Sequence, residues 1–355
     1  MRLVAREHAS PWRTPGAIAA AVTLTFLITA GPIRGSGASP VTAYRRFLFT
    51  PLTSSYSVYE VLLTATPLLF TGLAVAVAFQ AGYFNIGAEG QFLAGAMGAT
   101  VPGIHLADVP AGLALPLALA AGAVAGLGWA FLPAWLKRAA GIDEVVTTLL
   151  LNPVALLLLQ GLLNGPWRNP TSGFPDSETF GAGYRMPTML GDRVHAGLLI
   201  AIVLIAATVV VMTFTPLGLR IKAAGQSPDA ARFSGINVTR VQWSSALVSG
   251  AIAGLAGACQ VLGVQHQLTG SIAQGHGYTG IVVATLGALS AIGVLFVGLL
   301  LGLIGVGSQN ASLVLQIPPQ MGQLVTAVLL LTVVSCLAMR QYRLVRRRPP
   351  GAAES

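Results

Sequence analysis

The chain has 355 residues, of which 54% are hydrophobic and only 9% are charged. A soluble protein of this size carries about 25% charged residues, and the mean hydropathy here is +0.74. This composition excludes a single water-soluble core and predicts helices that cross a bilayer several times. The formal charge of +9 does not indicate nucleic-acid binding, because the bases form short clusters between and after apolar segments, as in the positive-inside pattern of membrane proteins.

The first apolar segment covers residues 16–32 and follows Arg2, Arg6 and Arg13. Basic residues ahead of an apolar run also describe a secretory signal, which would end in a cleavage site with small residues. Here Gly31 and Pro32 stand at the end of the run instead. We therefore interpret the segment as a retained first span, with residues 1–15 as a tail on the inner side.

Seven further segments are apolar over lengths that can cross roughly 30 Å of hydrocarbon. They cover residues 59–80, 83–101, 111–135, 144–164, 194–215, 244–265 and 320–339. A glycine-rich apolar stretch between Tyr278 and Gln309 is interrupted near residues 290–293, which predicts two short spans or a pair of half-helices. The predicted fold class is therefore all-α: a polytopic membrane domain over residues 16–339 with about ten transmembrane helices, some of them broken near the midplane.

The distribution of lysine and arginine predicts the orientation of these spans. The proposed inner side holds 14 of the 20 bases. They are Arg2, Arg6, Arg13, Lys137, Arg138, Arg220, Lys222, Arg232, Arg240, Arg340, Arg343, Arg346, Arg347 and Arg348. Because such bases accumulate on the cytoplasmic side, both termini are predicted to be cytoplasmic, with a basic tail over residues 340–355.

Two connections between spans are long and polar. The predicted outer connection, residues 165–193, is rich in proline, glycine and acidic residues, and the predicted inner connection covers residues 216–243. Within the inner one, Ser227-Pro228-Asp229 can begin a short helix that Gly235 ends, since a polar cap, a proline in the first turn and a glycine after the last turn favour that order. This helix would lie outside the membrane on its inner face.

The motifs of several enzyme classes are absent from the sequence. Neither lysine, Lys137 or Lys222, lies in a Walker A sequence, so the chain cannot hydrolyse ATP by that route. The patterns H-E-x-x-H, paired C-x-x-C and G-x-S-x-G are absent as well. We therefore predict no enzyme activity, no catalytic or metal-binding residue and no directly bound cofactor. Cys259 and Cys336 each lie in an apolar run and are interpreted as packing residues.

The polar sequence FQAGYFNIGAEGQ, residues 79–91, interrupts this apolar background. A charged residue at the centre of a membrane helix costs about 2.5–3.5 kcal/mol on insertion scales, so Glu89 requires polar surroundings. Asn85 and Glu89 are four residues apart and are expected to share a helical face. One interpretation is that Asn85, Glu89 and Gln91 line the path of a polar solute. The other is that Glu89 is hydrogen-bonded to a neighbouring helix and serves packing.

A second polar stripe joins Glu144, Thr148 and Asn152 at helical spacing. Asn152 lies deep in its predicted span and precedes Pro153, which loosens the local backbone ladder. We therefore count Asn152 among the candidate path residues. Glu144, like Glu60 on an earlier span, lies near a span end and is expected to be solvated at the interface.

The segment TPLLFTGLAVAVAFQAGYFNIGAEGQFLAGA resembles the signature of permease subunits in the ribose, nucleoside and branched-chain amino acid branch of ABC importers. Three further elements are similar to the same family: EVVTTLLLN at residues 144–152, AAGQSPDAARFSGINV at 223–238 and GYTGIVVATLGA at 277–288. The resemblance covers roughly residues 59–338 and is closest to the nucleoside and simple-sugar permeases. One departure follows Gly287, where the family has a polar or basic residue and this chain has Ala288-Leu289-Ser290.

This resemblance implies a permease subunit that imports nucleosides or related simple sugars across a bacterial inner membrane. It implies a second permease subunit, the same chain or a different one, and a separate ABC ATP-binding subunit that uses ATP. It also implies an extracytoplasmic solute-binding protein or lipoprotein. The coupling segment would contact the ATPase through Gly225, Asp229, Arg232 and Gly235. The substrate specificity of the family is not transferred through the element that ends at Ala288.

Two other classes of function stay open at this point. An ion-coupled secondary transporter would use Glu89 as a titrating group. A membrane scaffold without transport would use the inner connection only as a docking surface.

Overall fold

The computed structural model describes residues 2–5, 13–106, 109–272 and 274–345, which form two units. The terminal unit is made of Met1–Pro51 and Ile304–Ser355, and the central unit of Leu52–Leu303. The boundary falls within helix α12 (Ala291–Leu315). Each unit is described by itself.

The terminal unit joins the two ends of the chain. Its elements are β1 (Arg2–Ala5), α1 (Arg13–Gly35), α2 (Pro40–Leu48), the second half of α12, α13 (Met321–Gln341) and β4 (Tyr342–Val345), with the 3-10 turn η1 (Thr50–Leu52) at its border. α1 packs on α13, where the hydroxyl oxygens of Thr25 and Thr332 are 2.7 Å apart. β1 and β4 pair antiparallel, with Arg2 opposite Val345. The described ends of the chain therefore lie beside each other.

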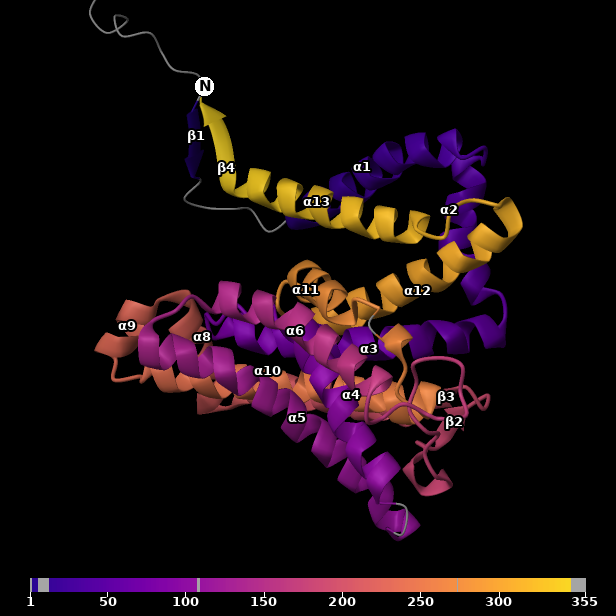
Figure 1. Ribbon diagram of the computed structural model, residues 1–355. Coiled ribbons are helices and arrows are strands. Elements are labelled where there is room, and N and C mark those ends of the chain that lie inside the picture. Colours follow the sequence, from indigo (N-terminus) through magenta and orange to yellow (C-terminus); the bar gives the residue numbers. More distant parts are fainter. Residues whose placement is uncertain (1, 6–12, 107–108, 273, 346–355) are drawn as a thin grey trace, which may run out of the picture. The chain divides into compact units, whose positions relative to one another are not determined.

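The central unit contains the helices that surround the candidate site (Figure 1). In chain order these are α3 (Ser55–Gln80), α4 (Ala88–His105), α5 (Ala111–Ala140), α6 (Glu144–Asn164), η2 (Ala182–Tyr184), β2 (Thr188–Leu190), β3 (Val194–His195), α7 (Gly197–Phe214), α8 (Pro216–Gln226), α9 (Pro228–Phe233), α10 (Val238–Gln260), the π-helical turn η3 (Val261–Gln265), η4 (Gly270–Ile272), α11 (His276–Leu286) and the first half of α12. β2 pairs antiparallel with β3.

Within the described part of the chain, six helices, α3, α5, α6, α7, α10 and α12, are long and apolar enough to cross a membrane. Shorter apolar helices lie within α1 and α13. The predicted class, an all-α polytopic membrane protein, is confirmed. The six are fewer than the ten helices expected, because the apolar described parts of α1 and α13 are shorter, α4 begins with a polar turn and α11 has only 11 residues.

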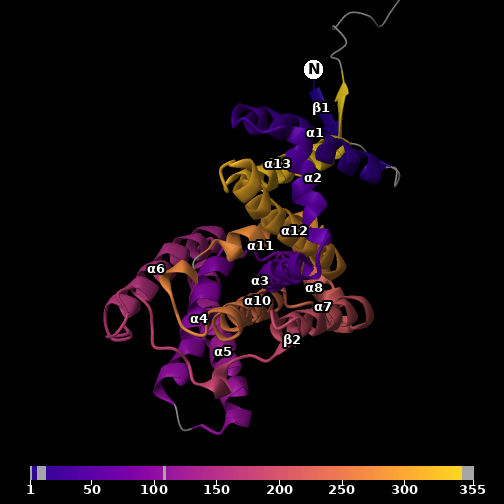
Figure 2. The ribbon, with the colours of Figure 1, turned by 90° about the vertical axis from the view of Figure 1, so that its right-hand side faces the viewer.

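The core of the central unit is built on α3, α4 and α10, which are mostly buried. Small residues let these helices and α5 approach closely: a Cβ atom at Gly95, Gly126 or Gly254 would collide with the backbone of a facing helix. Such contacts replace the hydrophobic effect as the packing force within lipid. Figure 2 shows α6 and α7 on opposite sides of α3 and α10.

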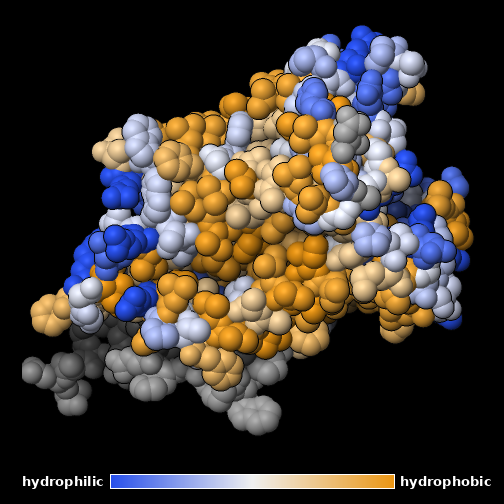
Figure 3. All heavy atoms as spheres, turned by 90° about the horizontal axis from the view of Figure 1, so that it is seen from below, coloured by the Kyte–Doolittle hydropathy of each residue, from blue (hydrophilic) through white to orange (hydrophobic). Residues whose placement is uncertain are grey.

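The outer faces of α5, α6 and α7 carry exposed large apolar side chains, among them Phe131, Leu157 and Val203. On the face shown in Figure 3, apolar residues form a broad band with hydrophilic residues along both sides. Such a surface matches hydrocarbon flanked by aqueous interfaces.

The two ends of the central unit carry different connections (Figure 1). At the basic end, defined here by Lys137, Lys222 and Arg232, lie the α5–α6 turn and helices α8 and α9. At the opposite loop end, residues 165–195 pack on residues 261–269; for example, the Ser177 backbone N–H donates to the Leu268 carbonyl at 2.9 Å. The predicted inner and outer connections therefore lie at opposite ends.

Some predicted helix boundaries are wrong. The predicted span 83–101 begins only at Ala88, because residues 81–87 are not helical. The predicted inner loop is largely helical: α8 begins after Thr215, whose hydroxyl accepts a hydrogen bond from the Gly218 backbone N–H at 3.3 Å, and Pro216 occupies the first helical position.

Two further predictions need correction, one between Tyr278 and Gln309 and one at the ends of the sequence. The break in that stretch lies at residues 287–290 rather than 290–293, and the stretch forms one half-helix, α11, followed by a helix of 25 residues, rather than two short spans or two half-helices. The tails predicted for 1–15 and 340–355 contain structure, since α1 begins at Arg13, α13 runs to Gln341 and β1 pairs with β4. Arg6 and the arginines at 346–348 lie outside the described residues.

Candidate functional site

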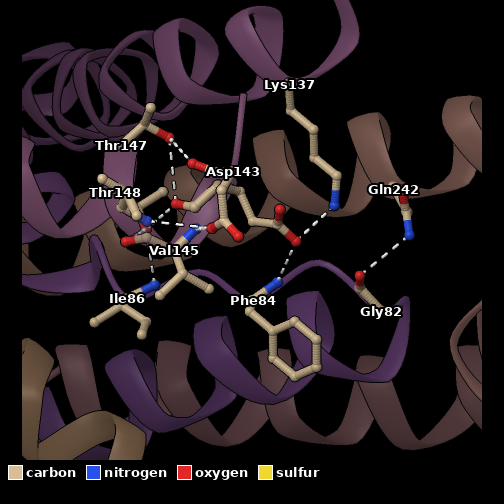
Figure 4. Close-up of polar contacts among 11 residues, drawn as sticks. Gly82, Phe84, Ile86, Lys137, Asp143, Val145, Thr147, Thr148 and Gln242 are labelled. Carbon is tan, nitrogen blue, oxygen red and sulfur yellow. Dashed lines mark hydrogen bonds and ion pairs between the residues drawn. The ribbon is translucent and has the colours of Figure 1, made fainter. Parts of the chain in front are cut away.

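The centre of the candidate site is the non-helical connection 81–87 between α3 and α4. Gly82 has a φ angle of +73°, which lets the chain turn out of α3. The Gln242 side chain donates from Nε2 to the Gly82 carbonyl at 3.1 Å (Figure 4). A Cβ atom at Gly82 would lie 3.2 Å from Cα of Gly225 in α8, so the connection also packs against the segment that follows α7.

Asn85 is fully buried within this connection. Its Oδ1 accepts hydrogen bonds from the Gly87 backbone N–H at 2.9 Å and from Gln91 Nε2 at 3.1 Å. Its Nδ2 donates to Gln91 Oε1 at 2.8 Å and to Ser249 Oγ at 2.9 Å. The prediction that Asn85 and Glu89 share a helical face is wrong, because the Asn85 side chain bonds to its own backbone two residues on, which favours a turn.

The polar stripe of α6 binds the other edge of the connection. Asn152 accepts from the Gly90 backbone N–H at 2.9 Å and donates to the Ile86 carbonyl at 3.0 Å. Thr148 Oγ1 accepts from the Ile86 backbone N–H at 3.2 Å. The backbone groups of Ile86, which have no helical partner, are therefore satisfied by side chains.

Glu144 is buried, with 7% of its surface exposed. Its Oε1 accepts from Lys137 Nζ at 2.5 Å and from the Phe84 backbone N–H at 3.3 Å (Figure 4). The expectation of an interfacially solvated Glu144 is wrong, because α5 ends at Gly141 with a φ angle of +66° and the short turn brings Lys137 beside the first residue of α6. Glu60, at the loop end, is ion-paired with Arg193 and partly exposed.

Glu89 connects α4 to the half-helix α11. Its carboxylate accepts from the Gly275 backbone N–H at 3.1 Å and from the Gly277 backbone N–H at 2.6 Å, and only 5% of the residue is exposed. The first N–H groups of a helix have no partner within the helix, and its N-terminus favours a negative charge. These contacts match the interpretation in which Glu89 is hydrogen-bonded to a neighbouring helix.

The four candidate path residues, Asn85, Glu89, Gln91 and Asn152, are all buried around one backbone segment. Asn85 and Gln91 bond each other directly, Asn152 bonds the backbone of Gly90 and Ile86, and Glu89 bonds the start of α11 instead. Two cavities at the basic end, of about 460 and 370 Å³, are lined by other residues. A path lined by these four side chains stays a prediction.

The candidate coupling residues lie at the basic end. Asp229 and Arg232 form an exposed ion pair of 2.7 Å within α9, and Gly235 follows this helix with a φ angle of +80°. The sequence predicted this short helix, but not the side chain of Phe233, which is 97% exposed at its end. Gly225 lies one turn earlier in the chain, in contact with α3 and the connection 81–87.

Several contributing residues were not predicted. Ser249 of α10 accepts from Asn85 and donates to the Ala74 carbonyl at 2.6 Å, Gln242 of the same helix donates to the Gly82 carbonyl, and Lys137 of α5 lies over the Tyr83 ring. Ser249 stands in a run of small residues that includes Ala253, and no sequence motif marks it. The signal in the sequence is the pair Gly82 and Gly87, because glycines permit an irregular backbone whose free groups require partners from elsewhere.

Comparison with known proteins gives a consistent result. Residues 57–334 match the model of a family described as branched-chain amino acid transport system / permease component. The chain is 34% identical to the glucose ABC transporter permease protein TsgB13 of Haloferax volcanii, over 97% of this chain and 93% of that protein. It is 32% identical to the nucleoside ABC transporter permease protein NupB of Lactococcus lactis, over 87% of this chain and 88% of that protein. It is 33% identical to the guanosine ABC transporter permease protein NupP of Bacillus subtilis, over 80% and 83% respectively.

Proposed function

Since this chain belongs to the family of branched-chain amino acid transport system permease components and is the membrane-spanning permease subunit of an ABC importer, we propose that it carries nucleosides or related simple sugars. The named relatives are permeases for glucose, nucleosides and guanosine. All of these solutes are polar, and hydrogen bonds rather than a fixed charge would recognise them.

The observation that carries the solute class is the chemistry of the buried polar groups in the central unit. Most are neutral amides and hydroxyls, as at Asn85, Gln91, Asn152 and Ser249. Among the residues that the structure describes there, the buried carboxylates are those of Glu89, bound by two backbone N–H groups, and Glu144, bound by one backbone N–H and by Lys137. This supports a neutral cargo rather than an anion or a cation. We propose that Asn85, Glu89, Gln91 and Asn152 form the wall of the path by fixing its irregular backbone.

Energy for this transport would come from a separate ATP-binding subunit. We propose that this subunit binds the basic end, at α8 and α9, where the apolar ring of Phe233 is exposed beside the Asp229–Arg232 pair. A large apolar side chain that is almost fully exposed on a polar, capped helix fits a protein interface. The basic end would then face the cytoplasm of the inner membrane, as would both termini.

Two more partners complete the proposal. A second permease subunit, the same chain or a related one, would cover the other side of the path, and a solute-binding protein or lipoprotein would deliver the solute at the loop end.

Reconstitution tests this function. The permease, its ATPase and its binding protein are placed in proteoliposomes with labelled guanosine, adenosine or glucose, and uptake is measured with ATP and with a non-hydrolysable analogue. We expect uptake of at least one of these solutes only with hydrolysable ATP and only with the binding protein. Uptake that needs neither, and that an ionophore abolishes, would instead establish the ion-coupled alternative.

A further inference from the structure

Gln80, the last residue of α3, contacts two separate parts of the central unit. Its Nε2 donates a hydrogen bond to the carbonyl oxygen of Leu289, in the turn between α11 and α12. Its own carbonyl oxygen faces Gly225 of α8, where a Cβ atom would collide with it. One residue therefore lies between the segment proposed to bind the ATPase and the end of the half-helix α11.

The turn that Gln80 holds has an unfavourable backbone conformation. Ala288 and Leu289 have φ angles of +52° and +58°, in the left-handed region that residues with a Cβ atom seldom adopt. Two adjacent non-glycine residues persist in this region only where their surroundings hold them. Within the turn the Leu289 backbone N–H donates to the Ala284 carbonyl at 2.8 Å. Gln80 supplies the bond to the Leu289 carbonyl from outside.

The cavity of about 460 Å³ borders this turn and gives it room to move. Its lining includes Gln80, Gly225, Ala288 and Leu289. The other amide atom of Gln80, Oε1, is buried and has no hydrogen-bond partner among the described residues. The Gln80 side chain therefore makes a single hydrogen bond, at the edge of this cavity.

The opposite end of α11 is held in a comparable way. There Glu89 accepts from the N–H groups of Gly275 and Gly277. Gln80 and Glu89 lie on the two sides of the connection 81–87. The Glu89 side chain binds the beginning of α11, and the Gln80 side chain binds the turn that follows its end.

We propose that Gln80 is a positioning residue for transport. Its bond to Leu289 holds the α11–α12 turn in the strained, left-handed state, and displacement of α8 against the Gln80 backbone releases the turn and lets α11 move. This inference rests on the proposed function of residues 216–238 as the ATPase contact.

Three variants test it in the complete importer. Gln80→Leu removes the donor at nearly constant size, and Ala288→Gly removes the Cβ penalty at the turn and so stabilises the held state. The third variant combines both changes. Gln160→Leu is the matched control, because Gln160 is exposed on α6 and lies in no part of the proposed machinery. Basal ATPase activity, uptake per ATP and the amount of folded protein are measured for each.

We expect Gln80→Leu to raise basal ATPase activity and lower uptake per ATP, each by about fivefold, the change in an equilibrium that loss of one neutral hydrogen bond produces. Ala288→Gly should lower basal ATPase activity, and the double variant should return it toward the wild-type value. A Gln80→Leu protein with wild-type uptake per ATP, or one that only folds less well, overturns the inference. So does an Ala288→Gly protein that changes in the same direction as Gln80→Leu.

Hydrogen exchange in the isolated permease separates this inference from the proposed function. The amide groups of residues 287–290 should exchange several-fold faster in Gln80→Leu than in the wild type or in Gln160→Leu. If the exchange rate of residues 287–290 is unchanged in Gln80→Leu, Gln80 does not hold the turn, whatever the transport assay shows. A wild-type importer without ATP-driven uptake, together with faster exchange in Gln80→Leu, overturns the proposed function while retaining the hold of Gln80 on the turn.

Discussion

Glu89 and Gly277 are joined by a hydrogen bond of 2.6 Å, from the Gly277 backbone N–H to a carboxylate oxygen in the first turn of α4. The same carboxylate accepts from Gly275, so one side chain in α4 binds two N–H groups at the beginning of α11. The helices also touch directly, since a Cβ atom at Gly277 would collide with the Glu89 backbone. The α4–α11 contact therefore depends on a carboxyl group at one residue and on the absence of a side chain at the other.

The first prediction concerns the carboxylate of Glu89. Glu89→Leu leaves two N–H groups at the start of α11 without partners, at a cost of about 1–3 kcal/mol each, so thermal unfolding in detergent should begin at a clearly lower temperature. Glu89→Gln keeps one acceptor oxygen and should retain partial uptake. Equal stability of Glu89→Leu and the wild type would show that these bonds do not hold α11.

The second prediction concerns Gly277, which has no side chain. Gly277→Ala forces a methyl group into the α4 backbone, and overpacking of this kind costs about 1–3 kcal/mol. Gly161→Ala is the control, because beyond the local backbone of α6 no described heavy atom lies within 4 Å of the added Cβ. Melting temperatures of both variants, measured in one detergent, should fall for Gly277→Ala and stay close to wild type for Gly161→Ala.

The third prediction tests whether the buried amides of Asn85 and Asn152 fix the backbone or contact the solute. Asn85→Leu and Asn152→Leu remove bonds to the backbone of Gly87, Gly90 and Ile86. From these contacts we expect loss of stability together with loss of transport, measured as unfolding temperature and as uptake per folded molecule. Wild-type stability with lost uptake would instead indicate side chains that contact the solute.

The fourth prediction concerns coupling. Asp229→Ala and Arg232→Ala break an exposed ion pair, and such pairs contribute about 0–1 kcal/mol, so the protein should remain folded. Solute-stimulated ATPase activity should nevertheless fall severalfold, as it should when Gly235, with its φ angle of +80°, is replaced by a bulky residue. Stimulated ATPase activity at the wild-type level in all three variants would exclude this segment from coupling.

The fifth prediction tests the orientation of the ends. Single cysteines at positions 176, 232 and 346 are labelled with an impermeant reagent in cells and in inverted vesicles. Position 176, at the loop end, should react only from outside, and positions 232 and 346 only from the cytoplasm. Reaction of position 176 from the cytoplasmic side contradicts the positive-inside assignment.

Much of this fold could be predicted because the membrane imposes length and polarity on each helix. The short helix α9 could also be predicted, from local cap residues that act within a few positions. Residues 83–87 fall within the predicted span 83–101 because their apolar neighbours continue the pattern. The actual course of the connection 81–87 depends on Asn152, Ser249 and Gln242, which lie far away in the sequence.

Glu144 is a second residue whose surroundings could not be predicted from the sequence. Its position near a span end is visible in the sequence, and interfacial solvation follows from that position alone. Its burial results from the left-handed Gly141, which turns α6 back so that Lys137 and the Phe84 N–H meet the carboxylate. A tertiary contact of this kind leaves no periodic signal.

The pairing of β1 with β4 and of α1 with α13 has a consequence for synthesis at the ribosome. Residues 13–35 are made before the central unit, Leu52–Leu303, and residues 321–341 after it. Helix α1 therefore gains its final neighbour only after the whole central unit has been made. A chain truncated before α13 would leave the Thr25 hydroxyl without Thr332, and would offer α1 to membrane quality-control proteases even though the central unit could already have assembled.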